Sequence, residues 1–181
     1  MRALLLVLIV ICLLVAAGIV YLFSGYYDIS ATRPHLKTTV WMINQLRERS
    51  IEFHSKGIKP HDLKDPKLLK AGVEHYHEMC RLCHEAPGYE KEEFAEGLYP
   101  RPPKLASKEI QEMSDAEAFW VLKNGIKMTG MPAFGPTHDE DELWGMVAFW
   151  RRLPGLKPEQ YKELLESAGV ETGKEEHHHH Q

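Results

Sequence analysis

Apolar side chains dominate the beginning of the chain. Positions 3–23 form a run of 21 residues without a charged or strongly polar side chain. As an α-helix rising about 1.5 Å per residue, such a run extends over roughly 31 Å, the thickness of the hydrocarbon core of a bilayer. The pattern predicts one membrane-spanning helix, in contact with lipid through residues 3–23.

The residues around this run favour an uncleaved anchor. A secretory signal has an apolar core of only about 7–15 residues. Tyr26 and Tyr27 follow the run, as is typical of a membrane interface, and Arg2 before it favours an N-terminus on the cytoplasmic side. The remainder of the chain would then lie outside the cytoplasm. A cleaved signal peptide is the alternative.

Apolar residues recur at helical spacing in the rest of the chain. Pro66 and Ser114 are residues that favour helix starts, and the acids from Asp139 to Glu142 suit the positive end of a further helix. The predicted helices cover 38–54, the stretch from Pro66 toward position 84, 114–124, 143–153 and 158–168.

The predicted helix over 38–54 lies between the apolar run and the other helices. Its apolar side chains are available for burial: Val40, Trp41, Ile43, Leu46 and Ile51. We interpret it as a strap that joins the anchor to a globular domain. Alternatively, its Trp41 face lies on the membrane surface.

Composition narrows the class of protein. Three cysteines in 181 residues are too few for a disulfide-built scaffold. The net charge of −4, from 22 basic and 26 acidic residues, argues against nucleic-acid binding, which needs a basic excess. The balance of charges also argues against a disordered chain.

The segment Cys80-Arg81-Leu82-Cys83-His84 carries the candidate chemistry. Cys-x-x-Cys-His is the attachment motif for c-type haem. Two thiols three positions apart on one helical turn can add to the two vinyl groups of one porphyrin. His84 can then offer its imidazole to the iron from the same side. The expected cofactor is one covalently bound haem c.

A thioredoxin-like redox pair and half of a zinc site are the competing interpretations of this motif. The redox pair requires a βαβ context, which the pattern lacks. The zinc site requires a second pair of ligands, and the third cysteine, Cys12, lies within the apolar run. Structural cysteines or a chance match are the remaining alternative.

The glycine- and proline-rich segment 124–135 is predicted to be a loop that supplies the second iron ligand. Met128 and Met131 each offer a thioether, a soft ligand that raises the potential of a histidine-ligated haem. Met131 is favoured because the fixed φ of Pro132 stiffens the chain beside it. The alternatives are ligation by Met128, or two methionines that only fill apolar gaps.

Three other histidines are possible iron ligands, namely His75, His77 and His138. His75 and His77 precede the motif on the same predicted helix and cannot easily reach the opposite face of the ring. We therefore expect these two side chains at the surface.

Three stretches of the chain occur together in one known family. They are Ala71-Gly72-x3-Tyr76-x3-Cys80-x2-Cys83-His84, Met131-Pro132-Ala133-Phe134 and Trp144-x3-Ala148-Phe149-Trp150. In this combination the chain resembles class I cytochrome c, and looks most like the membrane-anchored bacterial group related to the cytochrome subunits of cbb3-type oxidases. The resemblance covers about residues 66–155. It implies an all-α class I cytochrome c fold, here preceded by a single N-terminal transmembrane helix.

The resemblance also implies site residues. A carbonyl of Pro102 or Pro103 would orient the second ring nitrogen of His84, and Leu105 would pack on the haem. A plain polyproline connector is the alternative for 99–105. The long acidic stretch from 85 to 103 departs from the family pattern. The expected cofactor-binding residues are Cys80, Cys83, His84, Pro103, Leu105 and Met131, of which His84 and Met131 would ligate the iron.

Two polar segments have no assigned chemistry. Residues 85–96 hold five glutamates and one lysine, which is typical of a solvated loop or, alternatively, of a docking surface for a basic partner. The tail His177-His178-His179-His180 can bind a transition metal, but we assign it no function.

Together these features divide the chain into four parts. They are a transmembrane anchor (1–27), a juxtamembrane strap and linker (28–65), a haem domain (66–155), and a short helix with a polar tail (156–181).

The function expected is electron transfer by a single-pass protein of the inner membrane, with its haem domain on the periplasmic or outer side. It would exchange electrons with redox proteins or within a membrane respiratory complex, as a carrier and not as an enzyme. The alternatives are a haem-based gas sensor or small haem enzyme with a displaceable sixth ligand, and an assembly subunit without a redox role.

Overall fold

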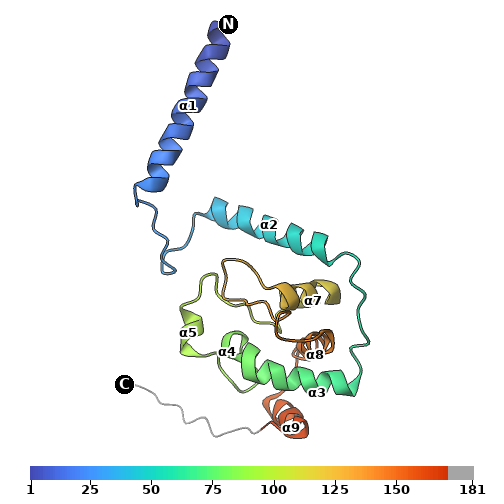
Figure 1. Ribbon diagram of the computed structural model, residues 1–181. Coiled ribbons are helices and arrows are strands. Elements are labelled where there is room, and N and C mark those ends of the chain that lie inside the picture. The colour runs from blue at the N-terminus through green and yellow to red at the C-terminus, as the bar shows by residue number, and fades with distance from the viewer. Residues whose placement is uncertain (171–181) are drawn as a thin grey trace, which may run out of the picture. The chain divides into compact units, whose positions relative to one another are not determined.

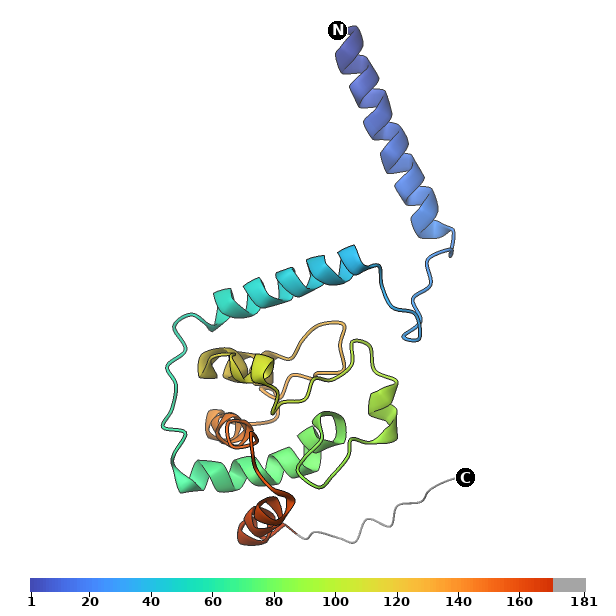
Figure 2. The same cartoon turned by 180° about the vertical axis from the view of Figure 1, so that it is seen from behind.

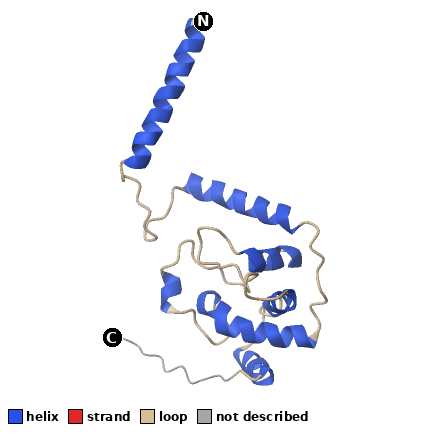
Figure 3. Cartoon of the chain, in the orientation of Figure 1, coloured by secondary structure: helices blue, strands red, loops and turns tan. Residues whose placement is uncertain are grey.

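The computed structural model describes residues 1–170, and its regular elements in that range are all helices (Figure 3). This confirms the predicted all-α class. The chain falls into two compact units, one of Met1–His35 and one that begins at Leu36. The histidine tail lies outside the described residues.

The first unit is built on α1 (Arg2–Phe23). This helix is long and apolar enough to cross a membrane, and none of its apolar span is buried within the protein. Beyond it, the Tyr27 hydroxyl lies 2.8 Å from Nδ1 of His35, and the two rings stack. A helix that exposes so many large apolar side chains needs an apolar environment of its own.

The second unit contains the remaining elements (Figures 1 and 2). They are α2 (Lys37–Ser55), α3 (Pro66–His75), η1 (Tyr76–Cys80), α4 (Arg81–His84), α5 (Glu93–Glu96), α6 (Lys108–Gln111), α7 (Asp115–Asn124), α8 (Glu140–Trp150) and α9 (Pro158–Ala168). The predicted helix over 143–153 begins and ends three residues earlier than expected. The acidic stretch expected to be a plain loop instead contains α5, whose Ala95 is buried.

Side-chain caps define where two of the helices begin. Ser114 accepts a hydrogen bond from the backbone N–H of Glu117, whose carboxylate accepts one from the N–H of Ser114. Asp139 and Glu142 make the same reciprocal pair at the start of α8. Caps of this kind stabilise a helix by about 1 kcal/mol. The Ser114 cap agrees with the predicted start of α7, whereas the Asp139 cap starts α8 three residues before its predicted start.

Two glycines allow α3 and α8 to cross in backbone contact. A Cβ atom on Gly72 would lie 1.9 Å from the carbonyl oxygen of Gly145, and one on Gly145 would lie 2.6 Å from the carbonyl oxygen of Leu68. Only residues without a side chain permit this approach. Gly72 was matched to the family pattern, whereas Gly145 was missed because a lone glycine inside an aromatic helix carries no periodic signal.

Aromatic rings fill the space around this crossing. Tyr76 packs on Phe149 with ring centroids 4.9 Å apart, and Phe149 stacks on Tyr161 at 5.7 Å. Tyr161 belongs to α9, so the last described helix completes the core that α3 and α8 begin. This packing gives the segment that leads into the Cys-x-x-Cys-His motif a rigid support.

Candidate functional site

The motif lies where one continuous helical segment ends. η1 follows α3 directly and ends at Cys80, and α4 then holds Cys83 and His84. Both cysteines are free thiols. Because three positions correspond to about one helical turn, the two sulfur atoms and the imidazole belong to the same short helical segment. Figure 1 shows α4 as the short helix that continues α3.

Burial raises the pKa of both thiol groups of the motif. Loss of hydration raises the pKa of Cys80 to about 12, and the neighbouring Cys83 adds to the shift. Burial likewise raises the pKa of Cys83. A redox or nucleophilic cysteine has a lowered pKa instead. The two side chains are therefore neutral thiols at pH 7, which disfavours the thioredoxin-like interpretation.

A backbone carbonyl orients the imidazole of His84. The carbonyl oxygen of Pro103 lies 2.8 Å from Nδ1. Since a carbonyl only accepts, Nδ1 must donate, and the lone pair of the neutral ring is then on Nε2. Burial lowers the pKa of His84, and the Pro103 carbonyl opposes that shift only in part. Of the two prolines expected here, it is Pro103 that makes the contact.

The chain after Pro103 is anchored to the core. The side chain of Leu105 is buried, and its carbonyl oxygen accepts hydrogen bonds from Nε2 of Gln111 at 2.8 Å and from Nε1 of Trp150 at 3.2 Å. These bonds hold the proline segment against α6 and α8, so its carbonyl has a defined position. Gln111 carried no signal in the sequence, because its partner is a backbone atom.

The loop that carries the candidate methionines is held by its own hydrogen bonds. The N–H of Met131 donates to Oγ1 of Thr129 at 3.1 Å, and that hydroxyl donates to the carbonyl of Ile126 at 2.8 Å. The N–H of Ile126 donates in turn to the carbonyl of Met131 at 3.1 Å. Gly125 has a φ of +66°, and a Cβ there would lie 2.7 Å from the backbone nitrogen of Ala133.

The two methionines of this loop differ in environment. Met131 is partly buried and packs against the same hydrophobic core that contains Cys80 and Leu105. Met128 is 97% exposed and has a φ of +59°. Of the two thioether groups, only that of Met131 lies beside the apolar core around the motif.

The expectation that His75 and His77 lie at the surface is wrong. His77 is buried, and its Nδ1 lies 3.0 Å from the Tyr161 hydroxyl, because α9 covers that side of the helix. His75 is partly buried, 3.5 Å from a carboxylate oxygen of Glu142, and its ring meets that of His138 edge-on. Packing against helices from distant parts of the chain buries these two side chains. Spacing along one helix does not show which helices pack against it.

The residues present fit a haem. One neutral imidazole nitrogen and one thioether sulfur are ligands that haem iron accepts, whereas a thioether is not a usual zinc ligand. Two thiol groups accompany the imidazole on one turn, one for each of the two vinyl groups of a haem. Leu105, Met131 and the buried aromatic residues supply apolar surroundings.

Comparison with known families gives one match. Residues 67–149 match the family described as cytochrome c oxidase, cbb3-type, subunit III. A search of curated proteins gives no match. The matched range includes the Cys-x-x-Cys-His motif, the proline segment and the methionine loop, and the family binds one haem c per domain. Residues 67–149 therefore form a c-type cytochrome domain related to cbb3-type oxidase subunits, and the chain is a haem-based electron-transfer protein.

Proposed function

We propose that the chain is a single-pass protein of the inner membrane that carries one haem c on the periplasmic side and passes electrons between respiratory partners. Its haem domain would work either as a tethered carrier or as a subunit of an oxidoreductase complex. Cys80 and Cys83 attach the haem, and His84 and Met131 ligate its iron.

The hydrogen bond between His84 and Pro103 is the observation that carries this proposal. It selects the tautomer with a free lone pair at Nε2 and fixes the ring plane, which are the two properties an axial ligand needs.

The methionine loop supports the choice of Met131 as the second ligand. Its backbone is tied to Thr129 and Ile126, so its side chain is presented from a fixed loop. Bound haem supplies one-electron redox chemistry, and a soft thioether raises its potential. If His84 and Met131 both bind the iron, no ligand position would remain for a substrate, as expected for a carrier.

The helix α1 supports attachment to the membrane. This helix of 22 residues has no buried position, and its only charge, Arg2, is at the N-terminal end. Positive charge is retained on the cytoplasmic side of membranes. The haem domain would then lie on the opposite side.

A spectroscopic comparison of two methionine variants tests the ligand assignment. The full chain is purified in mild detergent, and covalent haem is detected on a denaturing gel. Met131→Ala should abolish the methionine–iron charge-transfer band of the oxidised protein and lower its potential. Met128→Ala is the matched control and should leave both unchanged.

Three results would contradict the proposal. Absence of covalent haem from the wild-type protein would remove the whole function. A band that survives in Met131→Ala and disappears in Met128→Ala would reverse the ligand assignment. Rapid binding of carbon monoxide to the reduced wild-type protein at neutral pH would favour a gas sensor or haem enzyme instead.

A further inference from the structure

One side of α2 packs against the cytochrome domain. Ile51 and Ser55 are buried there, and the ring of His54 stacks on that of Trp120 from α7, with centroids 5.7 Å apart. Val40 and Asn44 are partly buried in the same row. These positions recur at helical spacing, so one side of α2 packs against α7.

The opposite side of α2 exposes a second row at the same spacing. Met42, Leu46, Arg49 and Phe53 follow one another at intervals of four, three and four residues. Leu46 is 73% exposed and Phe53 is 66% exposed. Because each residue turns the helix by about 100°, this row points away from the row that holds Ile51. We call these four residues the outer row.

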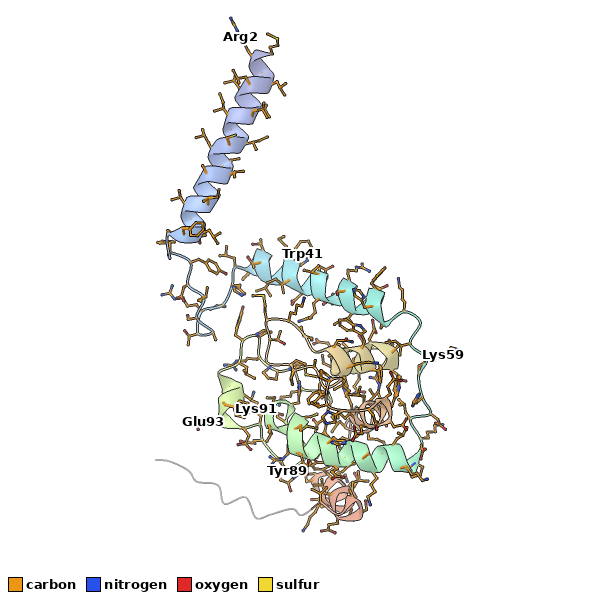
Figure 4. All side chains as sticks on the ribbon, viewed as in Figure 1. Arg2, Trp41, Lys59, Tyr89, Lys91 and Glu93 are labelled. Carbon is orange, nitrogen blue, oxygen red and sulfur yellow. The ribbon has the colours of Figure 1, made fainter. Side chains whose placement is uncertain are left out.

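Trp41 does not belong to the outer row. It is exposed as well, and Figure 4 shows it on the side of α2 away from α7. By helical spacing, however, it shares its side with Glu48 and Glu52. The apolar strip is therefore centred on Leu46 and not on Trp41.

Two basic side chains, Arg49 and Lys56, lie at or beside the outer row, and Nη1 of Arg49 lies 3.0 Å from a carboxylate oxygen of Glu52. Residues 36–59 as a whole contain five basic and two acidic side chains, a net charge of +3 within a chain of net charge −4. Nζ of Lys56 lies 5.8 Å from the centroid of the Phe53 ring. Long basic side chains can hold their charge in a polar layer while their stems and neighbours enter an apolar one.

The covalent chain keeps α2 close to whatever holds α1. Thirteen residues, 24–36, separate the two helices, and they extend over at most about 45 Å. A membrane spanned by α1 is therefore always within reach of α2. Anionic lipid attracts a basic amphipathic helix by about 1 kcal/mol per Lys or Arg near the surface.

We propose that α2 binds the surface of the membrane through the outer row, with Met42, Leu46 and Phe53 at the acyl boundary and Arg49 and Lys56 among anionic headgroups. α2 would then carry the cytochrome domain on its other side. This inference rests on the proposed membrane anchor. It fixes which side of the domain faces lipid, and thus which sides remain free for redox partners.

Spin labels on α2 of the full-length, haem-loaded protein test this surface. In a Cys12→Ala background, one label is attached at Leu46→Cys or Phe53→Cys, with Gln45→Cys and Glu52→Cys as controls on the same helix. Each protein is placed in nanodiscs of phosphatidylcholine mixed with phosphatidylglycerol. Collision with oxygen reports contact with lipid, and collision with a water-soluble nickel chelate reports contact with water. An unchanged haem spectrum shows that each variant is folded.

We expect the ratio of oxygen to nickel accessibility to be several-fold higher at 46 and 53 than at 45 and 52. The difference should weaken in nanodiscs of phosphatidylcholine alone. Nickel access at 46 and 53 equal to that of the controls would overturn the lipid surface while leaving the anchor intact. Shielding of 46 and 53 from both reagents would indicate a protein contact and would also overturn it. Failure of the protein to enter nanodiscs would overturn the anchor, and this inference with it.

Discussion

The hydroxyl of Tyr161 lies 3.0 Å from Nδ1 of the buried His77. Tyr161 belongs to α9, beyond the family-matched range of 67–149, whereas His77 lies within that range, three residues before Cys80. The ring of Tyr89 meets both rings edge-on. A helix outside the family pattern therefore supports the segment that carries the haem motif.

Replacing Tyr161 by Phe should destabilise the cytochrome domain. The change keeps the ring but removes the hydroxyl that contacts Nδ1 of His77, and loss of a buried hydrogen bond costs about 1 kcal/mol. Urea unfolding of the full chain in detergent, followed by haem absorbance, measures the loss. In a double-mutant cycle, His77→Phe should make the Tyr161 change less costly. Simple additivity of the two changes would show that the pair does not interact.

Substitution of Gly72 by Ala should disrupt the crossing of α3 and α8. The new methyl group would lie 1.9 Å from the Gly145 carbonyl oxygen, so the helices would have to separate. We expect a loss of at least about 3 kcal/mol in the free energy of unfolding, at the upper end of overpacking costs. Gly97→Ala is the control, since its methyl group would lie 3.4 Å from the Phe94 carbonyl oxygen, an ordinary contact distance. Equal stabilities of the two variants would contradict the crossing.

Thr129→Val should loosen the methionine loop. The substitution keeps the shape of the side chain but removes the oxygen that accepts from the N–H of Met131. Loss of such a bond costs about 1 kcal/mol. We expect imidazole to displace the methionine ligand of the oxidised protein several-fold more readily, as seen by optical titration. Thr137→Val, which removes a hydroxyl bonded to the Phe134 carbonyl, should have little effect. Equal imidazole affinities of both variants and the wild type would refute this role for Thr129.

The ion pair between Lys123 of α7 and Glu140 of α8 should be lost at acid pH. The hydrogen bond from Lys123, 2.7 Å from Glu140, and the charge of Lys123 hold the pKa of that carboxyl below its usual value. A lowered pKa in the folded state means that the contact stabilises the protein above the unfolded pKa. That contribution is lost as the pH falls through the folded pKa.

A carboxyl titration of the reduced protein by nuclear magnetic resonance checks this prediction. Lys123→Met should return the pKa of Glu140 upward toward its ordinary value. Lys162→Met, which removes another exposed partner of a glutamate, should not move it. An identical Glu140 titration with and without Lys123 would show that the ion pair does not form in solution.

Local patterns in the sequence located most of the elements. The start of α7 followed from Ser114, whose cap acts within one turn of its own helix. The start of α8 was predicted three residues too late, although the acids from Asp139 to Glu142 indicated a helix there. α9 was predicted over its observed bounds, since Pro158 and its apolar spacing are both local signals. The predicted division of the chain at positions 27, 65 and 155 stays a prediction.

The sequence predicted the contacts between distant segments only in part. The sequence restricted the partner of His84 to two prolines but did not distinguish them, because the choice depends on how Leu105 is held by Gln111 and Trp150. It offered Met128 and Met131 as alternatives, and their environments differ through folding of the loop onto the core. It misplaced His77, because spacing along one helix does not show what covers that helix.

By itself, the sequence determined the apolar N-terminal helix, the helical class, the approximate positions of the longer helices and the identity of the haem motif. All of these depend on residues within a few turns of one another, where periodicity, caps and short motifs act. Tertiary structure alone decided the contact of Gly72 with Gly145, the burial of His77 beneath Tyr161, and the direction of the outer row of α2. Each of these depends on which helix packs on which, and that is fixed by shape and burial across the whole domain.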